Sequence, residues 1–345
     1  MQGVVVHDWT PFHELKVETL DAPEASGDEV VIRTQAAGVS FATSLVVQGK
    51  YQVQPPRPFV PGTEIAGIIE QCGPKATRFK PGDRVCAVID WGGLAEKAVA
   101  REVNVYPISD QLEFCRAIVF TNSYATSAAA ICWPHLLNVQ AGDSLLVHGA
   151  SGGVGIAAVE IGKIRGARVI ATAGSAEKLT VAAAHGADEL INYRTEDFRE
   201  RVLELTDGLG VNAVYDPVGG DVFRQSLRCM AAEGRIMPVG FASGEVPQIP
   251  ANILLVKNLI VCGLNMGIYF GWGPRDLREQ YEDKMRAHMQ MMFDWLVEGA
   301  IDPVVQTTYP LAGVFQAMDD VLNRRAVGRI AVVMDEEARR LGHTD

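Results

Sequence analysis

Short apolar stretches broken by turns dominate the first third of the chain. Residues Val30–Ala36 alternate between apolar and polar positions, the run Glu64–Glu70 is rich in isoleucine, and a Pro-Gly turn leads into Val85–Ile89. Alternation with a period of two, and short runs bounded by Gly and Pro, are typical of strands. We therefore expect a compact, mostly β unit from Met1 to about Asn122.

After Asn122 the pattern changes to apolar strands that alternate with helical segments. Such alternation predicts right-handed crossovers and a parallel sheet covered by helices on both faces. The expected strands are Leu145–His148, Arg168–Ala171, Glu189–Ile191, Ala213–Asp216, Arg235–Val239 and Leu259–Gly263. The expected helices run from a glycine turn through Lys163, and over Ala176–His185, Glu196–Leu205 and Asp221–Met230. The fold class is therefore α/β, with a doubly wound parallel sheet.

The last part of the chain carries fewer elements. Amphipathic patterns predict helices over Tyr281–Glu298 and Leu311–Asn323, and an apolar run predicts a closing strand over Gly328–Met334. These elements are too small to bury a core alone. The charged residues 336–345 are expected to form a solvated helix end or a frayed tail.

These patterns divide the chain into two expected domains. The first consists of residues 1–122 together with 266–345, because the small last part most simply returns to the first unit. The second consists of residues 123–265, which would be an insertion within the first.

The composition fits a globular enzyme. The 345 residues are 48% hydrophobic and 21% charged, ordinary values for such a protein, and the length suits two domains. A formal charge of −11 argues against a general nucleic-acid surface or an anionic-membrane surface. No secretory signal and no membrane-length apolar run is apparent, and the cysteines are scattered (72, 86, 115, 132, 229 and 262). We expect reduced thiols in a cytoplasmic protein without a membrane partner.

The segment Leu145–Gly162, LLVHGASGGVGIAAVEIG, places a glycine-rich turn between an expected strand and an expected helix. Backbone N–H groups and the dipole at such a helix start favour a pyrophosphate. Ala150, Gly152 and Gly155 occupy the three positions of a dinucleotide fingerprint, which require a tight turn, close phosphate approach and close packing of helix on strand. The candidate phosphate-binding residues are Ala150, Gly152, Gly153 and Val154. The alternative is a glycine turn that closes an ordinary βα unit.

The residues after the second expected strand favour NADPH over NADH. An NAD site usually has an acidic residue there for the ribose hydroxyls, and neither Thr172 nor Ala173 is acidic. The turn at Gly174 is followed by Ser175 and Lys178, and Tyr193 follows the third strand, so a hydroxyl, a cation and a phenol are available for a 2′-phosphate. Otherwise Lys178 would be a solvated surface residue and Tyr193 a half-buried aromatic one.

Two further glycine turns follow expected strands, over residues 216–220 and 239–244. Ligands of open parallel sheets bind beyond the carboxyl ends of the strands, so these turns should line the cofactor groove. The candidate groove residues are Val218, Gly240, Phe241, Ser243 and, after the last strand, Asn265.

The motifs together resemble the zinc-free quinone oxidoreductase branch of the medium-chain dehydrogenase/reductase superfamily over nearly the whole chain. They are Ala37-Gly-Val-Ser40-Phe, Gln48-Gly-Lys-Tyr51, Pro61-Gly-Thr-Glu64-Ile-Ala-Gly67, Lys80-Pro-Gly-Asp-Arg84-Val, Ala150-Ser-Gly-Gly-Val-Gly155, Ile191-Asn-Tyr193, Asp216-Pro-Val-Gly-Gly220 and Val239-Gly-Phe-Ala-Ser-Gly244. The resemblance implies a GroES-like β domain completed by the C-terminal segment, an inserted Rossmann domain, and a cleft that holds substrate and nicotinamide. The family's 2′-phosphate residues match Ser175, Lys178 and Tyr193.

The resemblance also bears on zinc. Zinc-dependent relatives have Cys where this chain has Ser40, and Gly-His-Glu where it has Gly62-Thr63-Glu64. Hydroxyls are poor zinc ligands, and the stretch 87–114 lacks the closely spaced cysteines of a structural zinc lobe. We expect no metal, which leaves Glu64 as a partner for backbone groups or for an arginine.

Without a Lewis acid, hydride transfer suits an acceptor that is already electrophilic, namely a quinone or an alkene conjugated to a carbonyl. Tyr51 is the first candidate for a catalytic hydroxyl, followed by Ser40 and Thr126, and solvent is an alternative proton source. Many family members have Asn at the position of Ser40, so the substrate scope is expected to shift. Four aromatic residues either form a wall for a planar acceptor or belong to the core: Trp91, Tyr269, Phe270 and Trp272.

Two other functions stay open. One is a dinucleotide-binding protein with a sensing, nucleic-acid-binding or structural role, against which the acidic charge counts where nucleic acid is concerned. The other is an enoyl-thioester reductase, which would need a basic rim that the sequence does not suggest. The resemblance also implies a homodimer, and the apolar strand Asn258–Gly263 is an edge able to pair across a two-fold axis.

Overall fold

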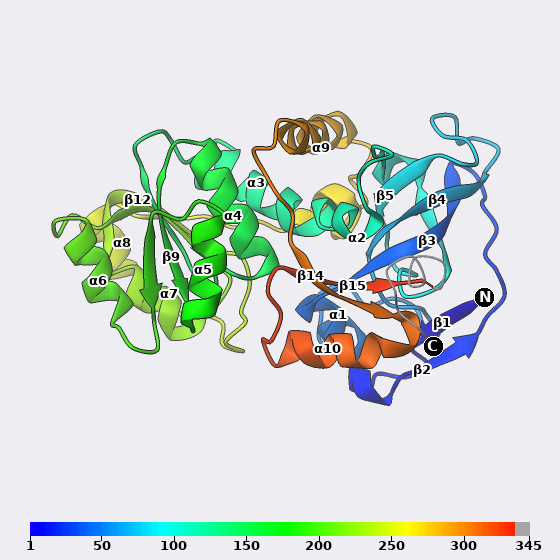
Figure 1. Cartoon of the computed structure of the whole chain (residues 1–345), viewed down its shortest axis with the longest axis horizontal. Coiled ribbons are helices and arrows are strands. Elements are labelled where there is room, and N and C mark those ends of the chain that lie inside the picture. Colours follow the sequence, from blue (N-terminus) through cyan, green and yellow to red (C-terminus); the bar gives the residue numbers. More distant parts are fainter. Residues whose placement is uncertain (335–345) are drawn as a thin grey trace. The chain divides into compact units, whose positions relative to one another are not determined.

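The computed structural model describes residues 1–334 and contains two compact units (Figure 1). The first unit consists of Met1–Asn122, Met266–Gln290 and the chain from Val305 onward. The second unit consists of Ser123–Asn265 and Met291–Val304. The tail expected over residues 336–345 lies outside the described residues. No helix among residues 1–334 combines the length and the apolar character that a bilayer crossing requires.

The second unit is built on a six-stranded parallel sheet in the order β10-β9-β8-β11-β12-β13. This is the doubly wound order in which the chain starts at a central strand and reverses direction once. The strands are β8 (Ser144–Val147), β9 (Arg168–Ala173), β10 (Glu189–Asn192), β11 (Val211–Asp216), β12 (Met230–Pro238) and β13 (Ile260–Val261). Their fully buried residues, such as Leu146, Ile170 and Val214, form the core of the unit.

Apart from the helical segments before β8, the helices of this unit connect successive strands. They are α3 (Ala125–Cys132), α4 (Gly153–Ile164), α5 (Ala176–Ala184), α6 (Phe198–Leu205), α7 (Gly220–Ser226) and α8 (Ala251–Lys257), with a π-helical turn over Phe120–Tyr124. Helix α7 ends earlier than the sequence pattern predicted, at Ser226 instead of Met230. The reason is that Cys229 and Met230 are buried, and the carbonyl of Cys229 accepts a hydrogen bond from the first residue of β11.

The first unit contains a seven-stranded sheet in the order β14-β15-β3-β4-β5-β7, with β6 paired to β3, and a separate β1-β2 pair. The strands are β1 (Gln2–Val5), β2 (Lys16–Thr19), β3 (Glu29–Val39), β4 (Glu64–Cys72), β5 (Arg84–Val88), β6 (Lys97–Arg101), β7 (Val105–Pro107), β14 (Val305–Pro310) and β15 (Arg329–Val333). The β15-β3 pairing joins residues 330–333 to the N-terminal strands.

The helices that lie wholly within the first unit are short. They are α1 (Phe41–Val47), α2 (Phe114–Ala117), α10 (Val314–Leu322) and the 3₁₀ turns η1 (Phe12–Glu14), η2 (Glu102–Asn104), η4 (Met266–Phe270) and η5 (Leu311–Gly313). The helix α9 (Glu282–Val297) begins in this unit.

One segment lies elsewhere than its expected domain. The sequence pattern assigned all of residues 266–345 to the first unit, whereas Met291–Val304 belongs to the second. Met292 and Ile301 are buried, and the backbone N–H of Asp302 donates to the carboxylate of Glu160 on α4 over 2.9 Å. Burial and a hydrogen bond to a buried carboxylate tie this stretch to the second unit.

Candidate functional site

The turn between β8 and α4 has the geometry of an anion site. The chain turns at Gly149, whose φ is +58°, and Gly152 is the N-cap of α4, so the first N–H groups of the helix follow it directly. A Cβ at Gly155 would lie 2.2 Å from the carbonyl oxygen of Gly149, so only glycine lets the helix approach the turn this closely. A Cβ at Gly152 would make only an ordinary contact at 3.4 Å, so the protein leaves the space in front of this residue open.

The other expected groove residues gather at the same edge of the sheet. In a parallel sheet the carboxyl ends of all strands lie at one edge, and the turns after β8, β11 and β12 are there. The turns after β11 and β12 bind one another: the N–H of Ala242 donates to Pro217, and that of Ser243 to Val218 at 2.9 Å. Gly240 and the exposed Phe241 belong to the second of these turns, and Asn265 follows β13.

A buried acid organises the turn after β11. Asp216 accepts hydrogen bonds from the N–H groups of Val218, at 2.7 Å, and Gly219. Burial raises the pKa of the Asp216 carboxyl to about 6, although these two hydrogen bonds oppose the shift. The sequence shows the motif Asp216-Pro-Val-Gly-Gly220, but it does not show that the Asp216 carboxyl is buried, because burial cannot be inferred from a glycine turn.

The loops after β9 and β10 bring a phenol and a guanidinium together at Gly174. A Cβ at Gly174 would lie 2.6 Å from the Tyr193 hydroxyl and 3.2 Å from Nε of Arg194, so only glycine lets these two side chains lie this close to the turn. Ser175 is the N-cap of α5 and accepts from the N–H of Lys178 at 3.3 Å, which leaves its hydroxyl hydrogen to donate. Tyr193 is 48% exposed, and Lys178 lies half-buried on the first turn of α5.

Sequence reasoning missed Arg194. The available signal was a basic residue directly after Tyr193. Its backbone N–H is held by Asn192 at 3.1 Å, and its side chain is exposed.

In the first unit, Glu64 and Arg329 form a buried ion pair. Glu64 is 3% exposed, and its other carboxylate oxygen accepts from Asn122 over 2.6 Å. Glu64 is on β4 and Arg329 is on β15, and these two strands flank β3. The two side chains therefore meet across β3, at Gly38. A Cβ there would lie 2.7 Å from the Glu64 carboxylate and 2.8 Å from the Arg329 guanidinium, so the glycine makes the pair possible. Both oxygens of Glu64 are therefore engaged.

Ser40 has a structural role at the start of α1. Its hydroxyl caps the helix by accepting from the N–H of Thr43 at 3.3 Å, and it lies 3.1 Å from the Thr43 hydroxyl. Thr126, the third candidate hydroxyl, is on α3 and so belongs to the second unit, whereas Ser40 and Tyr51 belong to the first.

Tyr51 offers a protonated hydroxyl. Burial and, secondarily, the charge of Glu64 raise the pKa of this phenol, so it stays protonated at neutral pH. Its ring meets Trp272 edge to face, with centroids 6.0 Å apart and planes at 65°. Among the residues that the structure describes, none makes a hydrogen bond to the Tyr51 hydroxyl, so the proton is available to another molecule.

The remaining candidates separate into core and surface. Phe270 is buried and Tyr269 meets Tyr281 at 4.8 Å, whereas Trp91 is 40% exposed. His148 is buried between the hydroxyls of Thr172 and Ser226, at 3.0 and 2.8 Å, and burial lowers its pKa to about 3. It is a neutral structural residue. Within residues 1–334, no cluster of His, Cys, Asp or Glu has the arrangement of a metal site.

Comparison with known families matches both parts of the chain. Residues 153–286 match the family described as zinc-binding dehydrogenase, and residues 26–110 match the alcohol dehydrogenase GroES-like domain.

Individual relatives cover nearly the whole chain. Quinone oxidoreductase-like protein 2 homolog of Nematostella vectensis is 39% identical over 307 residues, which cover 88% of this chain and 81% of that protein. Human quinone oxidoreductase is 28% identical over 338 residues, which cover 97% of this chain and 98% of that protein. The crystal structure of Escherichia coli quinone oxidoreductase complexed with NADPH aligns with a TM-score of 0.86 at 26% identity, covering 96% of this chain and 100% of that one. The chain therefore belongs to the quinone oxidoreductase branch of the medium-chain dehydrogenase/reductase superfamily, and it is an oxidoreductase with a dinucleotide cofactor.

Proposed function

We propose that this protein transfers a hydride from NADPH to a quinone or to an alkene conjugated with a carbonyl, without zinc. The observation that carries the proposal is the group of residues around Gly174. Tyr193 and Arg194 lie beside this glycine, and Ser175 and Lys178 follow it at the start of α5, where an NAD-specific fold would place a carboxylate. A 2′-phosphate carries two negative charges and suits that set of donors, whereas a ribose hydroxyl does not need it.

The rest of the cofactor would be held by backbone groups. The N–H groups at the start of α4, from Gly153 and Val154, suit the pyrophosphate, and Ala150 supplies the tight turn before them. The turns that contain Val218, Gly240, Phe241 and Ser243 suit the ribose and nicotinamide, as does Asn265. When bound, a reduced nicotinamide supplies the hydride.

The donor chemistry supports a reaction without a metal. Ser40 and Thr63 present hydroxyls where zinc-dependent relatives present Cys and His, and these are poor ligands for zinc. Glu64 is already neutralised by Arg329 and bound by Asn122. An acceptor that is electrophilic without help is therefore required.

Tyr51 is the proposed proton donor. Reduction of a quinone to a hydroquinone, or of an enone to a saturated ketone, adds one hydride and one proton. The raised pKa of Tyr51 keeps that proton in place at neutral pH, and its unengaged hydroxyl suits a hydrogen bond to the acceptor's carbonyl oxygen. Solvent would then restore the proton. Ser40 and Thr126 are the second choices for this role.

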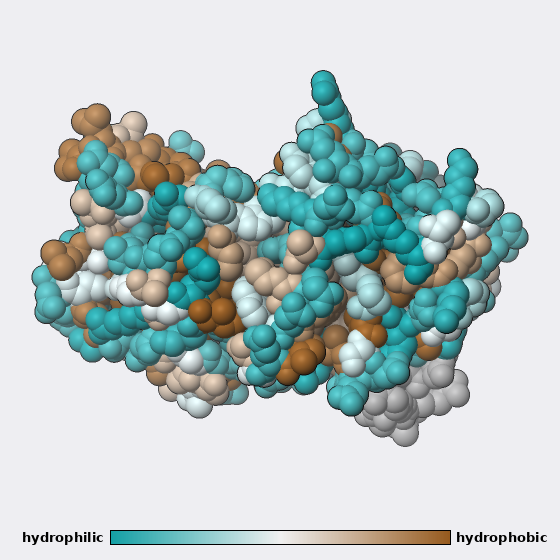
Figure 2. Space-filling view, turned by 90° about the horizontal axis from the view of Figure 1, so that it is seen from above, coloured by the Kyte–Doolittle hydropathy of each residue, from teal (hydrophilic) through white to brown (hydrophobic). Residues whose placement is uncertain are grey.

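We further propose a cytoplasmic homodimer in which the edge strand β13 pairs with its copy. Exposed apolar side chains gather beside this edge: Leu255 is 80% and Val256 79% exposed, and Ile260 lies on the strand itself. Figure 2 shows brown side chains gathered at the end of the second unit where α8 lies. An apolar edge of this kind is a liability for a monomer. In this proposal the first unit carries the acceptor and the second carries NADPH.

The test is an acceptor panel. Purified protein is mixed with NADPH, or with NADH in parallel, and with benzoquinone, naphthoquinone, short enones or an enoyl thioester, while the nicotinamide absorbance is followed. Turnover with NADPH well above that with NADH supports the proposal, and the best acceptor assigns the substrate class. Tight NADPH binding without turnover of any acceptor would favour a binding protein, and preference for NADH would contradict the assigned phosphate pocket.

A further inference from the structure

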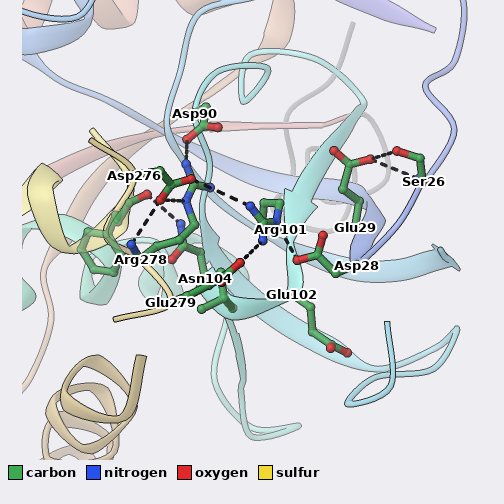
Figure 3. A network of polar contacts seen from close by, with 12 residues as sticks. Ser26, Asp28, Glu29, Asp90, Arg101, Glu102, Asn104, Asp276, Arg278 and Glu279 are labelled. Carbon is green, nitrogen blue, oxygen red and sulfur yellow. Dashed lines mark hydrogen bonds and ion pairs between the residues drawn. The ribbon is translucent and has the colours of Figure 1, made fainter. Parts of the chain in front are cut away.

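A buried arginine holds the segment that returns from β13 to the first unit. Arg278 is 6% exposed, and its guanidinium donates to Asp90 and to Asp276, each over 2.9 Å (Figure 3). Asp90 lies after β5 and Asp276 lies after η4, so one side chain joins two loops, and Arg278 is 188 positions from Asp90. A guanidinium with two carboxylate partners is a directional and rigid connection.

The backbone beside this arginine is fixed by the same contact. Gly271 has a φ of +97°, and a Cβ there would lie 2.0 Å from Nη2 of Arg278, so the chain passes directly over the guanidinium. On one side of Gly271, the carbonyl of Phe270 accepts from Asn104 over 2.9 Å. On the other side, the N–H of Trp272 donates to Gly267 over 2.7 Å. The backbone at Trp272 is therefore held on both sides of Gly271.

A tryptophan lies in each of the two loops that Arg278 joins. Trp272 follows Gly271 and meets the ring of Tyr51, the proposed proton donor. Trp91 follows Asp90 and is partly exposed. The indole of Trp272 is half-buried, so one part packs on the core and the other remains accessible.

We propose that Arg278 is a positioning residue for the acceptor, and that Trp272 makes this enzyme prefer planar, fused-ring quinones over small acyclic enones. This inference rests on the proposed function. An indole held beside a proton-donating phenol gives a flat conjugated ring a stacking surface while its carbonyl reaches the hydroxyl. A small enone has no aromatic ring to stack, so it gains little from Trp272. The role of Arg278 is to keep the indole in that place.

The experiment compares Arg278→Gln and Trp272→Leu with the wild-type chain. The measurements are KM and kcat for 1,4-naphthoquinone and for methyl vinyl ketone with NADPH. The Kd of naphthoquinone is measured separately on protein saturated with NADP⁺, where no turnover occurs. Loss of a stacked aromatic contact is expected to raise the naphthoquinone KM and Kd about tenfold, with less than about a twofold change for the enone.

Arg101→Gln is the matched control. Arg101 binds the same segment through Glu279, at 2.8 Å, and Asp276 (Figure 3). Within the described part of the chain its remaining partner is Asp28, at 2.6 Å, and not Asp90. It should leave the ratio of the two KM values unchanged. Arg278→Lys keeps the charge but loses the two-armed guanidinium. Its KM and Kd for naphthoquinone should lie between those of Arg278→Gln and the wild type. This variant replaces Arg278→Gln in the test if the glutamine variant does not fold.

The results separate the two proposals. Equal effects of Arg278→Gln and Arg101→Gln would show that Arg278 only anchors the segment, and an unchanged ratio in Trp272→Leu would remove Trp272 from the acceptor site. If the wild type reduces no acceptor, the proposed function fails. The Kd of naphthoquinone then still decides whether Trp272 and Arg278 form a site for a planar ring.

Discussion

The two candidate regions are built in different ways. At the carboxyl edge of the second unit, turns meet one another through backbone groups: Ala242 donates to Pro217, and Ala150 donates to Thr172 over 3.0 Å. In the first unit, buried side chains meet across long stretches of sequence, as Glu64 does with Arg329. The proposed cofactor edge therefore depends on where a side chain is missing, and the proposed acceptor region depends on which side chains are present.

That difference predicts which substitutions each region tolerates. A backbone-built site accepts side-chain changes unless an added atom displaces a turn. A site built from buried charges responds to the loss of any one partner, because the partner that remains is left buried and unpaired. The predictions below test this contrast, beginning with the largest effect.

Glu64→Gln should be the most damaging of these changes. It leaves the Arg329 guanidinium, 11% exposed, without a counter-charge, and breaking a buried pair typically costs about 3–5 kcal/mol. The free energy of unfolding by denaturant measures the loss. The control is the double variant Glu64→Gln with Arg329→Met, which removes both charges and should recover a large part of the stability. If the double variant is as unstable as the sum of the two single ones, the two residues are not a coupled pair.

Gly155→Ala and Gly152→Ala should separate stability from cofactor binding. The Cβ at position 155 would lie 2.2 Å from a backbone oxygen, so α4 must shift, at a cost of about 1–3 kcal/mol, and NADPH affinity should fall with it. At position 152 the Cβ meets no obstacle in the protein, so stability should change by less than about 0.5 kcal/mol while NADPH affinity still falls at least tenfold. Thermal unfolding and NADPH titration of both variants provide the test. Unchanged affinity in Gly152→Ala would mean that no phosphate approaches this turn.

The same contrast explains what the sequence could predict. The fingerprint turn, Ser175 and Tyr193 each follow a strand directly, so local patterns alone predict their place at the carboxyl edge of the sheet. The Glu64–Arg329 pair joins positions 265 residues apart, and no local pattern reports which arginine reaches Glu64. An arginine partner for Glu64 was among the expectations, but its identity depends on the order of strands in the sheet.

Two other differences also have identifiable physical causes. The edge strand β14 (Val305–Pro310) was missed because its residues are only partly buried and its sequence has no clear apolar run. Residues 291–304 were assigned to the wrong unit because their ties to the second unit, such as the hydrogen bond from Asp302 to Glu160, are tertiary contacts. The local sequence pattern therefore predicts most helices and strands, but it does not predict which distant residues contact one another.

Arg194→Gln and Lys178→Gln should each change cofactor preference without loss of the fold. Removing one charged hydrogen bond to a phosphate costs about 1.5–3 kcal/mol, so kcat/KM for NADPH should fall roughly tenfold or more, and that for NADH should stay nearly constant. Arg201→Gln is a matched control, since Arg201 pairs with Glu204 on the exposed face of α6. An equal loss with both cofactors in either variant would exclude that residue from the proposed 2′-phosphate site.

The smallest effect concerns a charge pair inside the backbone-built unit. Glu160, on α4, is buried and binds His185 over 2.7 Å, and the hydrogen bond and charge of Glu160 raise the pKa of His185, with the charge of Asp302 adding to it. A raised pKa means that the protonated histidine stabilises the fold below pH about 6.5, its unfolded value, and that this contribution disappears as the pH rises through the folded value. His185→Gln should therefore lower stability on the order of 1 kcal/mol at pH 5.5 and less at pH 8.5. Equal losses at both pH values would show that the pair is not ionised. A pH-dependent loss would instead show that the second unit also depends on a buried charge. That charge, on Glu160, belongs to α4, the helix whose N-terminus requires glycine.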